Sequence, residues 1–257
     1  MAAGRQLPGL KALITGASSG IGLATSRLLA ARGASVVGTG RDEAALAAAG
    51  LREASGPFVA TLARDLTDPG APAAVVAAAA GALGGLDLVV SNAGSGWSGR
   101  FEDMSPAEID AVLDINLRSA VHLAHAAAPW LRASAGPGQL ILVGSIAGLL
   151  GVPEEAVYST AKAALRGLAN SLRGEWRPIT ITLVSPGVVD TPFFARRNRP
   201  YARSWPRPIA VNRVASAIVS SVEHRQSEVI VPAWLTLPAR LAGGLPSLYA
   251  KMSQRWG

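Results

Sequence analysis

The chain has 257 residues, a length at which an α/β protein can bury a core without support from disulfides or metal. It has no cysteine, which excludes a disulfide framework, a thiolate zinc site and a cysteine nucleophile. The formal net charge of +7 comes from arginines spread along the chain with no basic recognition helix, so we expect no nucleic-acid partner. The histidines are scattered, and we expect no metal site.

In chain order, seven short apolar segments rich in β-branched residues are typical of strands that are covered on both faces. They span 11–15, 34–39, 58–62, 87–91, 139–143, 179–184 and 228–231. Helical patterns occupy 21–32, 43–53, 72–83, 106–132, 154–176 and 209–224. With right-handed crossovers, this α/β alternation predicts one doubly wound, seven-stranded parallel sheet flanked by helices. No internal repeat or linker interrupts it, so we expect a single domain.

The first predicted strand runs into the glycine-rich segment Thr15–Gly22, which opens the first predicted helix. Its glycines allow a tight turn and a close approach of the backbone, and the following helix N-terminus can meet a pyrophosphate. Ser18 and Ser19 add hydroxyls that can bond phosphate or cap the helix. A glycine triplet alone is weak evidence, but its place between a strand and a helix predicts a dinucleotide site.

Tyr158 and Lys162 lie one helical turn apart, with Ser145 upstream as a second hydroxyl. An ammonium beside a phenol favours the phenolate, which moves a pKa near ~10 towards the range useful for proton exchange with an alcohol or carbonyl. By itself, such a pair is often an exposed helical pair. Together with the glycine-rich segment, it indicates proton-transfer chemistry beside a dinucleotide.

In this combination the chain resembles the short-chain dehydrogenase/reductase family over residues 10–232. The ordered motifs are Thr15–Gly22, Asp65, Ser91–Gly94, Asn116, Gly144-Ser145, Tyr158/Lys162 and Pro186–Thr191. One departure is Ser91, where the family usually has an asparagine that braces the sheet, so we expect the site to stay intact. The resemblance implies a single Rossmann-type dinucleotide-binding and catalytic domain over 1–257, with a lid at about 188–208.

The resemblance also implies a catalytic role for each of four residues. Tyr158 is the general acid for carbonyl reduction and the base for alcohol oxidation, and Ser145 holds the substrate oxygen. Lys162 lowers the pKa of the tyrosine and binds the ribose of the nicotinamide half. Asn116, in a distorted helix, holds a water that extends the proton relay. The nicotinamide performs the hydride transfer itself.

For the cofactor, the resemblance implies that Asn92 and Gly94 lie against the adenosine ribose, Asp65 accepts from the adenine amino group and Thr191 contacts the carboxamide. Asp65 could instead be a cap and Thr191 a turn residue. The expected cofactor-binding set is Gly16, Ser18, Ser19, Gly20, Ile21, Gly22, Arg41, Asp65, Leu66, Asn92, Ala93, Gly94, Tyr158, Lys162, Pro186, Gly187, Val189 and Thr191.

The choice of nicotinamide cofactor depends on the end of the second predicted strand. An NAD enzyme places an acidic side chain there, on the ribose 2′-hydroxyl. Here Thr39 and Gly40 are followed by Arg41, whose guanidinium matches a phosphate in charge and geometry. Asp42 either receives the ribose hydroxyls or, as we favour, caps the next helix. Ser19 replaces a second basic residue that many NADP-preferring relatives carry, yet the pattern favours NADP(H) over NAD(H).

Candidate walls of the substrate pocket are 94–101, 146–152 and the lid, and the residues expected to contact substrate are Ser145, Trp97 and Phe193. Other aromatic lid residues are Phe194, Tyr201 and Trp205. The walls contain no evident set of convergent carboxylates or amides, so we expect a hydrophobic ketone, aldehyde or secondary alcohol as substrate.

Two alternatives stay open. The first is a 3-ketoacyl-thioester reductase, in which the lid arginines meet a phosphopantetheine phosphate; otherwise the arginine-rich segment is a solvated surface or a cationic collar. The second is a cofactor-binding regulatory protein without catalysis. The intact residues Tyr158, Lys162 and Ser145 argue against it.

The expected partners and location rest on weaker signals. In the family, the helices around Asn116 and Tyr158 pair between subunits, which implies a homodimer or homotetramer. The extension at about 232–257 is apolar and basic, and we expect it at an oligomer interface or over the substrate mouth; peripheral membrane contact is the minority alternative. There is no signal-peptide pattern and no apolar segment near ~18 residues, so we expect a cytoplasmic protein.

Overall fold

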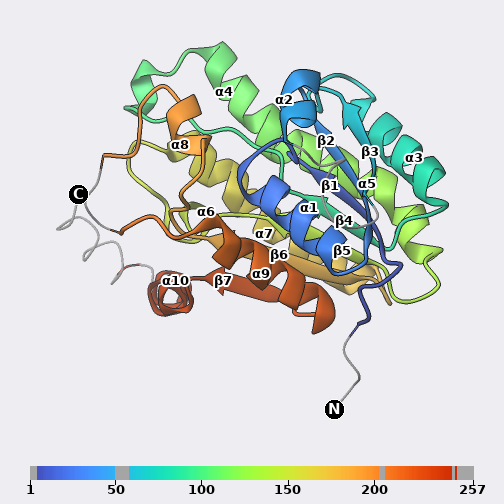
Figure 1. Ribbon diagram of the computed structural model, residues 1–257. Coiled ribbons are helices and arrows are strands. Elements are labelled where there is room, and N and C mark those ends of the chain that lie inside the picture. Colours follow the sequence, from blue (N-terminus) through green and yellow to red (C-terminus); the bar gives the residue numbers. More distant parts are fainter. Residues whose placement is uncertain (1–4, 50–57, 203–205, 245–246, 248–257) are drawn as a thin grey trace.

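A computed structural model describes residues 5–49, 58–202, 206–244 and 247, and a parallel sheet forms its centre (Figure 1). The strands are β1 (Lys11–Thr15), β2 (Ser35–Gly40), β3 (Phe58–Ala63), β4 (Leu88–Ser91), β5 (Gln139–Val143), β6 (Thr180–Pro186) and β7 (Glu228–Val231). Their order across the sheet is β3-β2-β1-β4-β5-β6-β7, with every neighbouring pair parallel. The predicted seven-stranded, doubly wound sheet of Rossmann type is confirmed. The strand order reverses between β1 and β4, where such sheets bind ligands.

Helices cover both faces of the sheet (Figure 1). They are α1 (Gly20–Ala31), α2 (Glu43–Ala48), α3 (Ala71–Leu83), α4 (Pro106–Leu113), α5 (Ser119–Arg132), α6 (Ala147–Leu150), α7 (Ala156–Glu175), α8 (Phe193–Arg196), α9 (Val211–Glu223) and α10 (Thr236–Gly244). Shorter turns are η2 (Phe101–Asp103), η3 (Asp114–Arg118) and η4 (Ala233–Leu235). Buried residues of α3, α5 and α7 pack on one face, and those of α1, α2 and α9 pack on the other.

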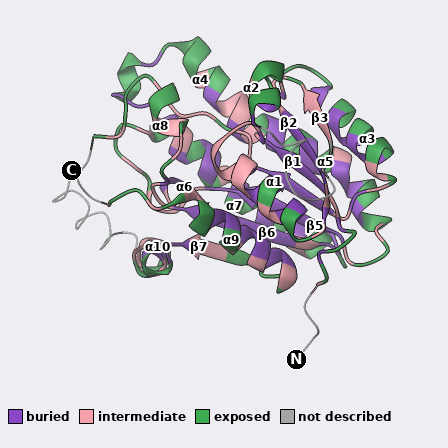
Figure 2. Cartoon of the chain, viewed as in Figure 1, coloured by how far each residue is buried: buried purple, intermediate pink, exposed green. Residues whose placement is uncertain are grey.

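The strands carry apolar residues continuously because both of their faces are buried. Successive side chains of a strand point to opposite faces. In β5, Leu140 and Leu142 join the cluster with α3, α5 and α7, whereas Ile141 joins the cluster with α1 and α9. All three side chains are fully buried. Figure 2 shows the same concentration of buried residues along the strands between the helical layers.

The helix expected over 106–132 is two helices joined by a π-helical turn. α4 begins with a capping box, in which Ser105 Oγ accepts from the Glu108 amide and the Glu108 carboxylate accepts from the Ser105 amide. The turn η3 then widens the helix by one residue before α5 begins. Its buried residue is Asn116, which thereby faces the molecule's interior.

Other boundaries differ from the prediction for local reasons. α7 begins at Ala156 because Glu154 has a left-handed φ of 66°, which a helix cannot continue through. α2 ends at Ala48, and residues 50–53 of the helix expected there lie outside the described residues. The short helices α6, α8 and α10 were not predicted. In the described ranges, no helix is both long and apolar enough to span a membrane.

Candidate active site

The loops that follow β1 to β6 line one pocket of about 2260 Å³. This exceeds the roughly 300–1,000 Å³ of ordinary small-molecule sites, so a dinucleotide and a second molecule can lie in it together. The pocket brings together these predicted site residues: Gly16, Ser18, Ser19, Gly20, Ile21, Arg41, Leu66, Asn92, Ala93, Gly94, Asn116, Ser145, Tyr158, Lys162, Pro186, Gly187, Val189, Thr191 and Phe193. Gly22, Asp65 and Trp97 were also predicted, but they do not line it.

The glycine-rich loop has the backbone shape that close contact with a phosphate requires. Gly16 and Gly20 have left-handed φ angles of 66° and 55°. A Cβ at Gly22 would lie 2.2 Å from the Gly16 carbonyl oxygen, so Gly22 shapes the loop from behind without lining the pocket. Ser19 stands at the N-cap of α1, yet its side chain makes no capping hydrogen bond. The first turn of α1 therefore keeps its backbone donors for a ligand.

Asn92 braces this loop from the end of β4. Its Nδ2 donates to the Thr15 carbonyl at 2.9 Å and more weakly to the Gly16 carbonyl. The Thr15 hydroxyl in turn accepts from the backbone amides of Asn92 and Ala93, both at 2.9 Å. The amide group of Asn92 thus holds the first and fourth strand ends together, in addition to forming part of the pocket wall.

At the other end of the pocket, two carboxylates are engaged with the local backbone. Asp42 Oδ1 accepts from the Ala45 amide at 3.0 Å and caps α2, which is the favoured one of its two predicted roles. Asp65 Oδ1 accepts from the amide and hydroxyl of Thr67, at 2.9 and 2.7 Å. Asp65 is not among the residues that line the pocket, although its neighbours Leu66 and Thr67 are, and its contact with the adenine stays a prediction.

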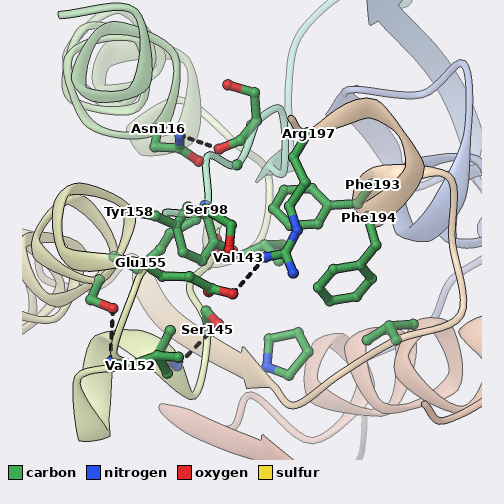
Figure 3. Close-up of a pocket in the computed structure, with 18 of the residues that line it drawn as sticks. Ser98, Asn116, Val143, Ser145, Val152, Glu155, Tyr158, Phe193, Phe194 and Arg197 are labelled. Atoms are coloured by element: carbon green, nitrogen blue, oxygen red, sulfur yellow. Dashed lines mark hydrogen bonds and ion pairs between the residues drawn. The ribbon is translucent and has the colours of Figure 1, made fainter. Parts of the chain in front are cut away.

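The four side chains expected to be catalytic all line the pocket, and Figure 3 shows Asn116, Ser145 and Tyr158 among them. The Ser145 side chain lies close enough to Tyr158 to affect the pKa of its phenol, and Ser145 Oγ accepts from the Ala147 amide at 3.1 Å. Lys162 Nζ donates to the Val143 carbonyl at 3.0 Å and lies 5.7 Å from the centroid of the Tyr158 ring. Asn116 Nδ2 donates to the carbonyls of Ser95 and Val112, while its buried Oδ1 has no hydrogen-bond partner among the described residues.

Burial dominates the electrostatics of this cluster. It raises the pKa of Tyr158 well above its usual value; the Ser145 side chain and Arg197 oppose the rise, and Glu155 adds to it. Burial also lowers the pKa of Lys162 to about 8. The rise in the Tyr158 pKa is opposite to the direction expected from Lys162, because burial of the phenol is the largest effect on it. The Lys162 ammonium donates to the Val143 carbonyl instead. A protonated Tyr158 is suited to donate a proton.

The lid closes one side of the pocket with aromatic rings. Phe193 lies 5.6 Å from Tyr158 and 5.3 Å from Phe194, and Phe194 lies 5.2 Å from Tyr201, measured between ring centroids. Trp205, also expected in the lid, lies outside the described residues. η4 and α10 add apolar side chains to the pocket wall, so the start of the C-terminal extension covers part of the pocket.

Two observations bear on the substrate end. Trp97 does not line the pocket; it packs in an apolar cluster that also includes Tyr158, and its Nε1 donates to Glu108 at 2.9 Å, so its contact with substrate stays a prediction. The pocket is also less uniformly apolar than expected, since Arg197 and Glu155 form an ion pair in its wall, with Nη1 and Oε1 2.5 Å apart. These two residues are far apart in sequence, so no local pattern could reveal the pair. The described residues contain no cluster of three potential metal ligands.

The residues present fit a nicotinamide dinucleotide. The left-handed glycines and open helix end form a cradle for its phosphates, and Gly94 leaves space that a side chain would fill, since a Cβ there would lie 2.6 Å from Asn116 Oδ1. A doubly wound sheet with this cradle and a Ser–Tyr–Lys cluster at its carboxyl edge defines the class of nicotinamide-dependent oxidoreductases.

The chain belongs to the short-chain dehydrogenase/reductase family, whose sequence profile, described as short chain dehydrogenase, matches residues 11–202. It is 31% identical over 234 residues to the ketoacyl reductase HetN of Nostoc sp., covering 88% of this chain and 79% of that protein. It is 35% identical over 187 residues to the 3-oxoacyl-[acyl-carrier-protein] reductase FabG of Vibrio cholerae, covering 72% and 75%.

Solved structures agree with the fold. A short-chain dehydrogenase from Sphingobium yanoikuyae in complex with NADPH superposes with a TM-score of 0.80 at 28% identity, covering 95% of each chain. A short-chain dehydrogenase/reductase from Burkholderia phymatum in complex with NAD has a TM-score of 0.86 at 24% identity, covering 95% of this chain and 96% of the other. The neighbours thus include proteins bound to either cofactor.

Proposed function

We propose that this NAD(P)-dependent oxidoreductase uses NADP(H) to interconvert a hydrophobic ketone or aldehyde and the corresponding alcohol. The observation that carries the proposal is the cluster of Ser145, Tyr158 and Lys162, which lies in one pocket with the glycine-rich loop and beneath an aromatic lid. The bound nicotinamide supplies or accepts the hydride. The side chains of this chain do the rest: they hold the substrate oxygen and move the proton.

In the direction of reduction, Tyr158 donates its phenolic proton to the substrate oxygen as negative charge develops there. The raised pKa keeps that proton in place until it is needed. Ser145, whose side chain acts on the phenol, donates to the same oxygen and fixes its position. Lys162 holds ribose hydroxyls and returns a proton towards Tyr158, and the unpartnered Oδ1 of Asn116 accepts from the water that links Lys162 to solvent.

The preference for NADP(H) is supported by the charges at the end of β2. Arg41 and Arg64 both line the pocket there. The neighbouring carboxylates of Asp42 and Asp65 are held by backbone donors and do not line it. A 2′-phosphate would therefore meet guanidinium groups, whereas a free 2′-hydroxyl would meet no acidic acceptor of the kind that NAD enzymes use.

A consumption assay tests this function directly. Purified protein should oxidise NADPH in the presence of at least part of a carbonyl panel graded in size and charge, and should do so more slowly with NADH. Cofactor binding without turnover of any carbonyl or alcohol in the panel would favour the regulatory alternative.

Reduction of a 3-ketoacyl thioester is the second candidate. Two of the relatives above are named as ketoacyl and 3-oxoacyl reductases. The exposed lid arginines Arg196 and Arg199 line the pocket and suit an anionic carrier group. A much larger kcat/KM for an acetoacetyl thioester on its carrier than for the free ketones would favour this candidate.

We also propose a homodimer or homotetramer. Val121 and Trp130 on α5 are each 38% exposed although both are large and apolar, which supports an interface on that helix. Sedimentation of the wild type and of Trp130→Glu would test the proposal. The cytoplasmic location stays a prediction.

A further inference from the structure

A buried ion pair lies in the pocket wall beneath the lid. The side chains of Arg197 and Glu155 are only 5% and 16% exposed. Arg197 Nε donates to the Arg199 carbonyl at 2.6 Å, and its guanidinium carbon lies 4.8 Å from the centroid of the Phe194 ring. The guanidinium is thus fixed by a carboxylate, a carbonyl and an aromatic ring before any substrate arrives.

One nitrogen of this guanidinium, Nη2, remains available to bind a ligand. Its Nη1 and Nε have partners, but Nη2 makes no hydrogen bond to the described part of the chain. Figure 3 shows the guanidinium projecting into the space between Tyr158 and the lid rings Phe193 and Phe194. Both Arg197 and Glu155 also act electrostatically on Tyr158, which places the pair close to the reacting group.

A substrate that fills this pocket would cover the free donors of Arg197. A buried guanidinium N–H without an acceptor is costly, and a purely hydrocarbon ketone offers none at that place. Because Glu155 already balances the positive charge, the missing partner is a neutral acceptor oxygen and not a second carboxylate.

Contacts other than the Arg197–Glu155 pair also hold the lid in place. Asn198 bonds both backbone groups of Ser98, accepting from its amide at 2.8 Å and donating to its carbonyl at 2.7 Å. Arg199 pairs with Glu154 at 3.7 Å. These contacts join the lid to the loops that carry Ser98 and Glu154, and the Asn198 contact does so without a charged group. Asn198 does not line the pocket, so it provides a control for lid fastening alone.

We infer that Arg197 is a substrate-specificity residue whose Nη2 binds a second, uncharged oxygen of the substrate, close to the carbonyl that Tyr158 and Ser145 hold. The inference rests on the proposed carbonyl–alcohol activity and narrows its substrate class. Preferred substrates are carbonyl compounds with a neighbouring ester, thioester, keto or hydroxyl oxygen. Glu155 is the positioning residue that orients Arg197 and cancels its charge.

The test compares two ketones of equal chain length, ethyl 3-oxobutanoate and 2-heptanone, in wild type, Arg197→Met and Asn198→Ala. Comparing each variant with wild type cancels the different intrinsic reactivity of the two ketones. Arg197→Met should lower kcat/KM for the oxo ester by about ten- to a hundredfold and leave 2-heptanone nearly unchanged. Asn198→Ala should change both by the same factor.

A second variant addresses the charge. Glu155→Gln keeps the shape of the partner but leaves the guanidinium charge unbalanced, so the anion 3-oxobutanoate should gain about tenfold relative to its ethyl ester. This readout also holds if Arg197→Met fails to fold. Equal factors for both ketones in Arg197→Met, or no charge effect in Glu155→Gln, would overturn the assignment of Arg197. A wild type that reduces no carbonyl compound would overturn the proposed function itself.

Discussion

Arg196 of the lid donates a hydrogen bond from Nη1 to the hydroxyl of Ser19 on the glycine-rich loop, at 3.0 Å. Nearby, Thr191 packs against the same loop, so that a Cβ at Gly20 would lie 3.2 Å from Thr191 Cγ2. Ser19 occupies the place where many NADP-preferring relatives carry a basic residue. In this chain, a guanidinium reaches that place from the lid, above the open end of α1.

We expect Arg196 to contact the pyrophosphate, which NADPH and NADH share. Arg196→Ala should therefore weaken the binding of both cofactors by a similar factor, about three- to tenfold, because solvent screens the exposed side chain. Affinities are measured by quenching of tryptophan fluorescence. Arg199→Ala, which removes an exposed arginine from the same lid, should leave both affinities unchanged. A loss confined to NADPH would instead assign Arg196 to the 2′-phosphate.

Tyr158→Phe should reduce kcat for carbonyl reduction by at least about two orders of magnitude, because the ring remains while the proton donor is lost. The affinity for NADPH should stay within about twofold of the wild type. Steady-state kinetics and fluorescence titration measure the two effects separately. Substantial reductase activity in this variant would show that another group donates the proton.

The sequence predicted the strands well wherever a strand coincides with a continuous apolar segment. The strands over 11–15 and 139–143 match the structure residue for residue, because the sheet buries them almost continuously. The strand over 228–231 matches too, although it lies at the sheet edge and only Val231 is buried. The glycine-rich loop and the Tyr158/Lys162 spacing were equally visible, since each depends on a few neighbouring residues.

What the sequence could not predict depends on tertiary contacts. The π-helical turn at Asn116 shifts the helix register by one residue and leaves the hydrophobic pattern unchanged, so only the family resemblance implied a distorted helix there. Two side-chain contacts depend on how segments separated in sequence pack together: the ion pair between Arg197 and Glu155, and the hydrogen bond from Trp97 to Glu108. The pKa of Tyr158 depends on how deeply its phenol is buried, which the spacing to Lys162 does not reveal.

The buried ammonium of Lys162 predicts a pH-dependent stability. A lysine in the unfolded chain titrates near 10.4, whereas burial lowers the pKa of Lys162 to about 8 in the fold. Between these values the unfolded chain binds more protons, so the free energy of unfolding rises with pH from about 8 to about 10.4. Below pH 8 both states are charged, and the full cost of burying the charge is present.

Compared with the cofactor-free wild type, Lys162→Met should therefore lose relative stability as the pH rises from 7 to about 10.5, by about 3 kcal/mol in the free energy of unfolding. Urea unfolding at the two pH values measures this difference. Lys11→Met, which removes a lysine that donates to Gly84 on the surface, controls for the loss of one positive charge. A pH-independent difference for Lys162→Met would contradict the lowered pKa.

Arg41→Ala should weaken NADPH by about 1.5–3 kcal/mol, or one to two decades in affinity, because a charge-assisted hydrogen bond to the 2′-phosphate is lost. NADH, which lacks that phosphate, should bind almost as before, and higher salt should weaken NADPH more than NADH in the wild type. Asp42→Ala is the matched control: loss of the α2 cap should cost about 1 kcal/mol of stability and leave the cofactor preference unchanged. Selective loss of NADH binding in Asp42→Ala, or tighter binding of NADH than of NADPH by the wild type, would make Asp42 the ribose ligand and reverse the assignment.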